Sequence, residues 1–299
     1  MAHEMTRREF IKHTAVAGAA AAAGLGAAGA AGAGEAAAKP LPTIKLGGLE
    51  VSRFILGSNP FWGYSHKSPE LNEEMKAYHT DERIVATLDE AARCGLTTIA
   101  SPPEERWVDL FGKYVAGGGK LKIWLAQCHV DPSKMKEDID RSIKGGAKAV
   151  FIQGHRVEQQ FKIGAFDTLR AWIDQIKAAG LPAGLASHWP EVLPEIERRK
   201  FPTDFYYQCF YNVTAGPTYR EEERAKAVEV IARLEKPVVA YKILAAGRLA
   251  PADGFEFAFS HIRPKDGVCV GIYMKDARDQ IRQNATFTEM LTAAGQGKA

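Results

Sequence analysis

The sequence has little of what would assign it to several common classes of protein. Its four cysteines among 299 residues are too few for a disulfide framework, and no CxxC pair occurs. Basic and acidic residues, 39 and 36, nearly balance, and no basic stripe favours nucleic acid as a partner. No GxGxxG follows the first expected strand, which counts against a Rossmann domain. With 46% hydrophobic and 25% charged residues, the composition is that of a globular protein, which excludes a disordered or collagen-like chain.

The first 38 residues differ in composition from the rest. Arg7 and Arg8 precede Phe10, and a run of alanine and glycine follows over residues 15–33. This order is typical of a secretory signal, and the paired arginines resemble the twin-arginine (Tat) signal. We therefore expect residues 1–38 to be a signal peptide and leader that engages the Tat export machinery, and the mature protein to be periplasmic or otherwise extracytoplasmic. The run is too rich in glycine for a strong anchor, so we expect no stable membrane insertion after processing.

Beyond the leader, short apolar runs alternate with longer amphipathic stretches. The runs predict strands at Phe54–Leu56, Thr97–Ala100, Lys122–Ala126, Ala149–Gln153, Ala183–Ala186, Phe205–Gln208, Val238–Lys242 and Gly267–Gly271. The stretches predict helices at Asp81–Cys94, Trp107–Val115, Pro132–Gly145, Phe166–Gly180, Glu191–Lys200, Glu221–Glu235 and Asp276–Leu291. Alternation of this kind favours an α/β fold, a single (β/α)8 TIM barrel over residues 39–292, with an open doubly wound sheet as the alternative. Residues 293–299 are expected to be a flexible tail.

Five segments together resemble the aldo-keto reductase family in order and spacing. Leu46–Gly57 is similar to its opening hairpin and first strand, and Phe151–His155 to its fourth strand, which ends in a catalytic histidine. Tyr207–Asn212 resembles the sixth strand, whose glutamine lies near the nicotinamide. Tyr241–Leu249 resembles the seventh strand and its cofactor loop, and Met274–Asn284 the eighth strand's helix, which holds the adenosine 2′-phosphate. The resemblance implies the same barrel and NADP as cofactor.

Carried over residue by residue, the resemblance makes His155 the catalytic histidine. The Asp, Tyr and Lys of the family's tetrad have no counterpart; Glu104 or Glu105 falls where the tyrosine would be, and such a carboxyl would replace the phenol only if burial kept it protonated. The implied cofactor-binding residues are Ser187, His188, Gln208, Lys275, Arg278 and Asn284. Alternatively, Lys275 and Arg278 belong to an exposed helix face.

The strand ends themselves indicate a second chemistry. Catalytic groups of TIM barrels lie at the carboxyl ends of the strands, where this chain places His129, His155, His188 and Lys242. The three imidazoles are candidate ligands for a divalent metal such as Zn²⁺, Mn²⁺ or Fe²⁺, or hydrogen-bond donors to substrate. The amine of Lys242 is a candidate for a Schiff base with a carbonyl substrate, or for contact with an anion or other substrate group.

These features predict an exported, aldo-keto-reductase-like enzyme whose partner is a carbonyl or sugar-type small molecule. An NADP-dependent oxidoreductase is one form of it, with His155, Glu104, Glu105 and Lys242 as the candidate catalytic residues. A metal-dependent or cofactor-free sugar lyase or isomerase in the same barrel is the alternative, and a non-catalytic ligand-binding barrel is a third. The polar stretch 64–79 is a candidate lid or a surface loop.

Overall fold

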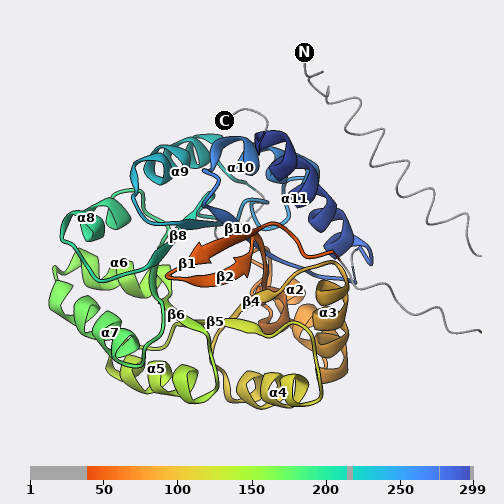
Figure 1. Ribbon diagram of the computed structural model, residues 1–299, viewed down its shortest axis with the longest axis horizontal. Helices are drawn as coiled ribbons and strands as arrows, with labels where there is room; N and C mark the ends of the chain where they lie inside the picture. Colours follow the sequence, from red (N-terminus) through yellow and green to blue (C-terminus); the bar gives the residue numbers. More distant parts are fainter. Residues whose placement is uncertain (1–38, 214–217, 276, 297–299) are drawn as a thin grey trace, which may run out of the picture. The chain divides into compact units, whose positions relative to one another are not determined.

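The computed structural model describes residues 39–213, 218–275 and 277–296, and the leader lies outside these residues. Eight parallel strands form a closed barrel in the order β10-β3-β4-β5-β6-β7-β8-β9, surrounded by helices (Figure 1). The strands are β3 (Phe54–Gly57), β4 (Thr98–Ser101), β5 (Ile123–Cys128), β6 (Ala149–Ile152), β7 (Ala183–Ser187), β8 (Phe205–Cys209), β9 (Val238–Tyr241) and β10 (Gly267–Gly271). All eight predicted strands are confirmed to within two residues, and the chain is a (β/α)8 TIM barrel.

The helices include every one that the sequence predicts and three that it does not. They are α2 (Pro69–Tyr78), α3 (Asp81–Arg93), α4 (Glu105–Ala116), α5 (Met135–Lys144), α6 (Gly154–Lys162), α7 (Phe166–Ala178), α8 (Val192–Arg198), α9 (Glu221–Arg233), α10 (Pro251–His261) and α11 (Gln280–Gln296), with short 3₁₀ turns η1 (Asn59–Trp62) and η2 (Pro132–Lys134). The unpredicted helices are α2, α6 and α10. Because α11 continues to Gln296, the helical part of the barrel domain extends past the predicted boundary at 292.

The barrel interior is filled by side chains that alternate along the strands. A cluster of buried apolar residues runs from the hairpin of β1 (Thr43–Leu46) and β2 (Leu49–Ser52), which closes one end, to Phe151 and Tyr207 toward the other. The rings of Phe151 and Tyr207 stack in parallel with centroids 4.1 Å apart. The barrel is therefore a packed core up to this aromatic layer, and open space begins above it.

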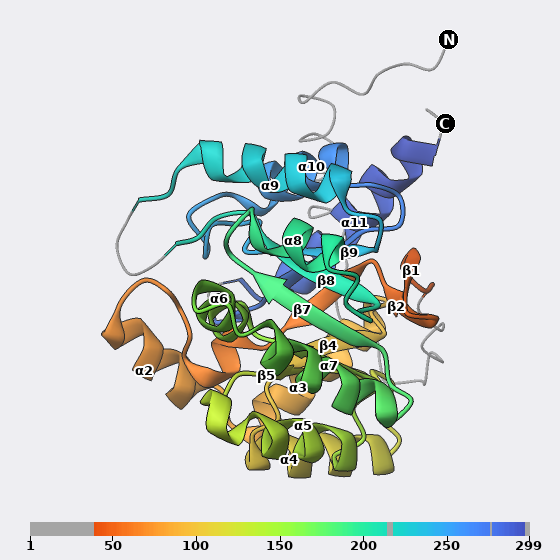
Figure 2. The same ribbon diagram turned by 90° about the vertical axis from the view of Figure 1, so that its left-hand side faces the viewer.

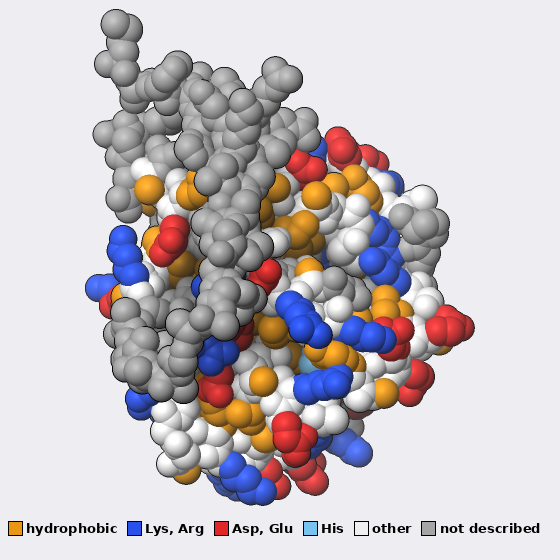
Figure 3. All heavy atoms as spheres, turned by 90° about the vertical axis from the view of Figure 1, so that its right-hand side faces the viewer, with side chains coloured by type: hydrophobic (Ala, Val, Ile, Leu, Met, Phe, Trp, Pro, Cys, Tyr) orange, Lys and Arg blue, Asp and Glu red, His pale blue; other side chains and the backbone are white. Residues whose placement is uncertain are grey.

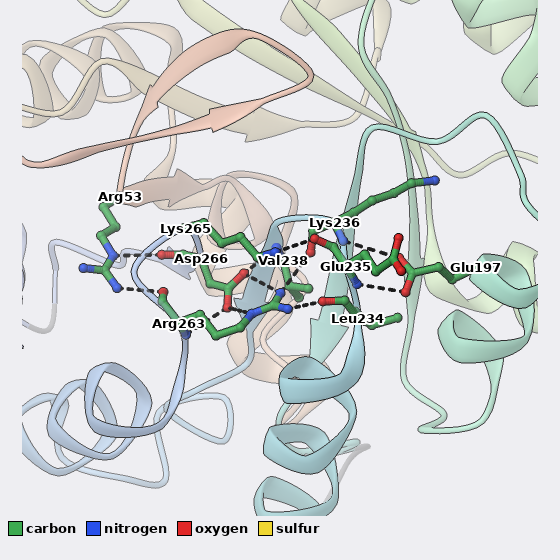
Figure 4. Close-up of polar contacts among 9 residues, drawn as sticks. All are labelled: Arg53, Glu197, Leu234, Glu235, Lys236, Val238, Arg263, Lys265 and Asp266. Carbon is green, nitrogen blue, oxygen red and sulfur yellow. Dashed lines mark hydrogen bonds and ion pairs between the residues drawn. The ribbon is translucent and has the colours of Figure 1, made fainter. Parts of the chain in front are cut away.

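Polar groups at the end where the strands begin are tied together by one buried carboxylate (Figure 4). Asp266, just before β10, is fully buried and accepts hydrogen bonds from the backbone of Val238 at 2.8 Å and from the guanidinium of Arg263 at 2.7 Å. Arg53, before β3, donates to the carbonyl oxygens of Asp266 and Arg263 at 2.8 and 3.0 Å. This network joins the starts of β3, β9 and β10.

One predicted helix cap is displaced by a residue. Gly95 and Gly180 have the left-handed conformation expected after a helix, with φ of 83° and 74°. Gly145 does not, since its φ is −72°; Gly146, with φ of 87°, takes the left-handed position. The chain turns into β6 at this second glycine because only it adopts the positive φ.

The face drawn in Figure 3 carries interspersed charges. Lys and Arg side chains alternate there with Asp and Glu and with hydrophobic side chains wherever grey atoms do not cover the surface. In the part of the chain that the structure describes, no helix combines the length and apolar character needed to cross a membrane.

Candidate active site

A cavity of about 460 Å³ opens at the carboxyl ends of the strands. It lies at the end where Figure 2 shows α2 and α6, opposite the β1–β2 hairpin. Its floor is the aromatic layer of Phe151, Tyr207 and Tyr241. Its polar lining includes His66, His129, Arg156, His188, Tyr207 and Lys242. This is the end at which TIM barrels carry their active sites.

His188, the residue that follows β7, is held by a buried carboxylate. Its Nδ1 lies 3.1 Å from Oε1 of Glu158, which projects from α6 and is 5% exposed. The same Oε1 also accepts hydrogen bonds from the backbone N–H of His188 and, at 3.0 Å, from the hydroxyl of Ser187. Three donors thus fix the carboxylate, and the carboxylate fixes the imidazole at the cavity wall.

The charge of Glu158 determines which nitrogen of the neutral His188 ring carries the proton. Burial alone would raise the pKa of Glu158, but the hydrogen bonds and charge of His188, with the bond from Ser187, outweigh burial and lower it. A carboxylate only accepts hydrogen bonds, so the neutral imidazole carries its proton on Nδ1. In that tautomer Nε2 carries no proton and can accept one from another group.

His129, after β5, is a different kind of histidine because both its nitrogens face carboxylates. Nε2 lies 3.2 Å from Glu104, and Nδ1 lies 3.9 Å from the buried Asp138. The hydrogen bond from His129 lowers the pKa of Glu104, so this carboxyl is ionised and does not supply the protonated acid that would replace a tyrosine. Glu104 and the exposed Glu105 line a neighbouring hollow of about 510 Å³ and not the main cavity.

Lys242 follows β9 at the edge of the cavity in a left-handed conformation, with φ of 56°. Its ammonium lies 3.5 Å from the carbonyl oxygen of Val213. Burial lowers the pKa of Lys242, with the nearby Cys209 and Glu158 acting in the opposite direction. His66, on the other side of the mouth, also has positive φ, 55°, and burial together with the charge of Lys242 lowers its pKa to about 4. Such strain in residues of non-glycine type is characteristic of functional sites.

The segment between β3 and α3, which includes α2, reaches across the mouth. Lys67 donates to the carbonyl of Gly247 at 3.1 Å, and Arg248 donates to the carbonyl of His66 at 2.8 Å. Farther along the segment, Glu74 accepts hydrogen bonds from Tyr273 and Lys275, both at 2.7 Å. The stretch expected to be a lid or surface loop is largely the helix α2, hydrogen-bonded to the loops after β9 and β10.

The predicted placement of His155 is wrong. Strand β6 ends at Ile152, and the chain continues as α6 from Gly154, so the alternation of a strand no longer applies at His155. His155 is exposed and does not line the cavity. Gln153, just before α6, and Arg156, in the first turn of α6, line the cavity instead.

The predicted cofactor residues do not assemble into an NADP site. Ser187 and Gln208 are buried and do not line the cavity; Ser187 instead binds Glu158. Lys275 forms an ion pair with Glu74 at 2.7 Å, and Arg278 is exposed. Asn284 is fully buried. Of the six, only His188 lines the cavity. The loop after β9 and the segment after β10, which were both expected to hold the cofactor, are instead hydrogen-bonded to the segment 58–80. The residues present therefore do not fit NADP in the predicted manner.

The predicted metal site is not formed either. His129 and His188 line the cavity from β5 and β7, but His155 points elsewhere. Among the described residues, no group of three or more His, Cys, Asp or Glu side chains is arranged to hold a metal ion. His129 and His188 are each engaged with a glutamate instead.

The sequence prediction missed Glu158 and Arg156 because α6 itself was missed. Positions 154, 157 and 158 are buried at helical spacing, but only Val157 among them is apolar, so the sequence carries little periodic signal for this helix. His66 was missed because its segment has no strand and its position depends on contacts with the distant residues Gly247 and Arg248.

Comparisons with known proteins identify the leader and support the fold. Residues 4–24 match the model of the twin-arginine translocation (TAT) pathway signal sequence, so the chain carries a Tat signal consistent with export. The comparison with curated proteins found no match. A crystal structure described as "the putative aldo-keto reductase" from Pseudomonas aeruginosa is 19% identical with a TM-score of 0.61, over 87% of this chain and 99% of that one. A second, from the same organism and with the same description, is 18% identical with a TM-score of 0.58, over 83% and 97%. The chain is thus an exported-type TIM barrel that resembles aldo-keto reductases in structure.

Proposed function

We propose that this protein is an exported barrel enzyme that moves protons on a carbonyl or sugar-type small molecule, as an isomerase or lyase, without NADP. The observation that carries the proposal is the His188–Glu158 pair, in which a buried carboxylate 3.1 Å from Nδ1 holds an imidazole that lines the cavity. The same cavity holds Lys242 and the phenol of Tyr207. These are the parts required for general-base catalysis with stabilisation of a developing oxyanion.

The reaction can be written with the chain's own residues. Nε2 of His188 takes a proton from the carbon next to the substrate carbonyl. The electron pair of that C–H bond forms the carbon–carbon double bond of an enolate, and the carbonyl oxygen gains the negative charge beside the ammonium of Lys242. Where the carbon that lost its proton bears a hydroxyl, the hydroxyl proton passes to the enolate oxygen. The protonated His188, stabilised by Glu158, then returns its proton to the former carbonyl carbon, and the carbonyl now stands on the neighbouring carbon, which completes an isomerisation. Loss of a leaving group from the enolate would give the lyase form.

NADP-dependent reduction, which the structural resemblance suggests, is the second candidate. The aldo-keto-reductase-like fold is compatible with NADP. We rank it lower because Lys275, at one predicted phosphate position, is paired with Glu74, and Asn284 is fully buried and does not line the cavity.

The test is carbon-bound deuterium uptake from D₂O, measured by NMR on a panel of aldoses, ketoses, sugar acids and sugar phosphates. We expect wild-type protein to exchange the proton next to the carbonyl of at least one compound. His188→Gln should lower that rate by roughly 10²-fold or more, the usual contribution of a general base. His261→Gln, an exposed histidine at the end of α10, is the matched control and should exchange like the wild type. Oxidation of NADPH by the panel without any exchange would refute the proposal in favour of the reductase.

A further inference from the structure

The charges that line the mouth cavity are all of one sign. Lys67, Arg156 and Lys242 contribute cationic side chains to its wall, and within the described ranges no aspartate or glutamate lines it. Two glutamates contact histidines of its wall: Glu158, which is satisfied by three donors, contacts His188, and Glu104 lies 3.2 Å from Nε2 of His129. The cavity is therefore electropositive toward whatever enters it.

The three cations have neutral oxygen atoms as partners. Lys67 donates to the carbonyl of Gly247 at 3.1 Å, Arg156 to the carbonyl of His129 at 2.9 Å, and the ammonium of Lys242 lies 3.5 Å from a carbonyl oxygen. In the described part of the chain none of the three makes an ion pair with a carboxylate. Elsewhere, by contrast, cations such as Arg263 are paired with carboxylates at 2.7 Å. A carbonyl holds such a side chain in place but is not a neutralising counter-ion for it.

Two further groups face the same space. Tyr207 is 3% exposed, lines the cavity, and its hydroxyl has no hydrogen-bond partner within the described structure. Helix α6 begins at Gly154, also on the cavity wall, and no side chain caps its first turn. A buried hydroxyl without a partner is destabilising unless a ligand accepts its proton. Both groups are donors, and both favour an acceptor with negative charge.

We infer that the mouth cavity is built for an anionic substrate, a carbonyl or sugar compound that carries a carboxylate or a phosphate ester. This inference rests on the proposed function for the carbonyl part of the substrate and adds its charge. Lys242, Lys67 and Arg156 bind the anionic group, and the phenol of Tyr207 donates to it or to the neighbouring oxygen. A neutral sugar of the same size leaves the three positive charges uncompensated and binds weakly.

Isothermal titration calorimetry with inorganic phosphate, D-glucuronate and D-glucose tests the inference. We expect at least one of the two anions to bind saturably at millimolar concentrations, more weakly as salt is added, and D-glucose to bind at least about tenfold more weakly. Lys242→Met and Lys67→Met should each weaken the anion by about tenfold. Lys113→Met removes an exposed lysine from the outside of α4 and is the matched control that should bind like the wild type.

The same titrations distinguish the two kinds of anionic group, a phosphate ester and a carboxylate. Phosphate that binds while glucuronate does not indicates a phosphate ester, and the reverse indicates a sugar acid. Absence of binding by both anions, or anion binding that is unchanged in both Lys242→Met and Lys67→Met, would overturn the inference. Circular dichroism confirms that each variant is folded, and Lys67, which is exposed, carries little risk to folding. Anion binding that persists while deuterium exchange is absent would refute the proposed function and leave this inference standing.

Discussion

At the end of the barrel where the strands begin, every oxygen of the Asp266 carboxylate accepts hydrogen bonds, and its partner Arg263 spreads its donors over that carboxylate and two carbonyls. At the end where the strands finish, the phenols of Tyr207 and Tyr241 have no partner among the described residues. The first arrangement stabilises the fold. The second leaves hydrogen-bonding capacity open for a ligand, which is the physical signature of a binding site.

Backbone strain is also concentrated at the end where the strands finish. Of the five non-glycine residues with positive φ in the described ranges, four lie in the mouth segments: His66, Lys242, Ala245 and Ala246. Each costs roughly 1 kcal/mol relative to an unstrained conformation. Cross-mouth hydrogen bonds from Lys67 and Arg248 hold these segments in place. Stability and strain are thus separated along the barrel axis.

The largest effect of a single substitution on stability is expected at the closed end. Asp266→Ala removes a fully buried carboxylate and leaves Arg263 and the Val238 N–H without their acceptor. We expect the free energy of unfolding to fall by about 3–5 kcal/mol in urea denaturation. Arg198→Ala, which breaks an exposed pair with Glu195, should change the free energy of unfolding far less and is the control. Equal losses in the two variants would contradict the contrast between the ends.

We expect His66, at the mouth of the cavity, to make the stability of the protein depend on pH. Its folded pKa of about 4 lies below its ordinary value of 6.5, because of burial and the charges of Lys242, His188 and Arg248. The unfolded chain therefore binds more protons between these values, and stability is lost as pH falls from 6.5 to 4. The loss attributable to this residue is roughly 3 kcal/mol.

His66→Asn keeps a residue type that tolerates positive φ and removes the titration. Thermal unfolding followed by circular dichroism from pH 7 to pH 4 should show a shallower decline for this variant than for the wild type. Parallel curves would show that His66 is protonated at little cost in the folded protein.

A smaller effect distinguishes two neighbouring tyrosines. The hydroxyl of Tyr206 bonds to Thr203 at 3.1 Å, whereas that of Tyr207 has no partner in the described structure. Tyr206→Phe should lower the free energy of unfolding by about 1 kcal/mol, and Tyr207→Phe should leave it unchanged or raise it by up to about 1 kcal/mol. Urea denaturation measures both. A destabilised Tyr207→Phe would mean that the phenol already has a partner and is not reserved for a ligand.

The sequence predicts the barrel well because each strand is a short apolar run bounded by turns, a local signal. It predicts the site less well because the site depends on where strand periodicity ends. Extending the alternation of β6 by three residues moved His155 into the cavity; the structure begins α6 at Gly154, and helical spacing brings Arg156 and Glu158 inward instead. The position of His66 depends on contacts with residues about 180 positions away, which no local pattern encodes.

The resemblance to a family predicts the fold for the same reason, but the structure places several of the residues it implies for the cofactor away from the cavity. The barrel survives low identity because apolar strands are interchangeable, as the TM-score of 0.61 at 19% identity shows. The cofactor positions do not, because each depends on one side chain being free. Here Ser187 is bound to Glu158, and Lys275 to Glu74.

The most direct test of the central claim, that Glu158 makes His188 the general base of the mouth, is the pH–rate profile of deuterium exchange in Glu158→Gln. This variant keeps the size of the side chain and an acceptor for Nδ1 but removes the charge that stabilises the protonated ring. The account predicts a rate at least about tenfold below the wild type, with the profile shifted because His188 becomes a weaker base, in a protein that remains folded by circular dichroism. A wild-type rate with an unshifted profile would contradict it.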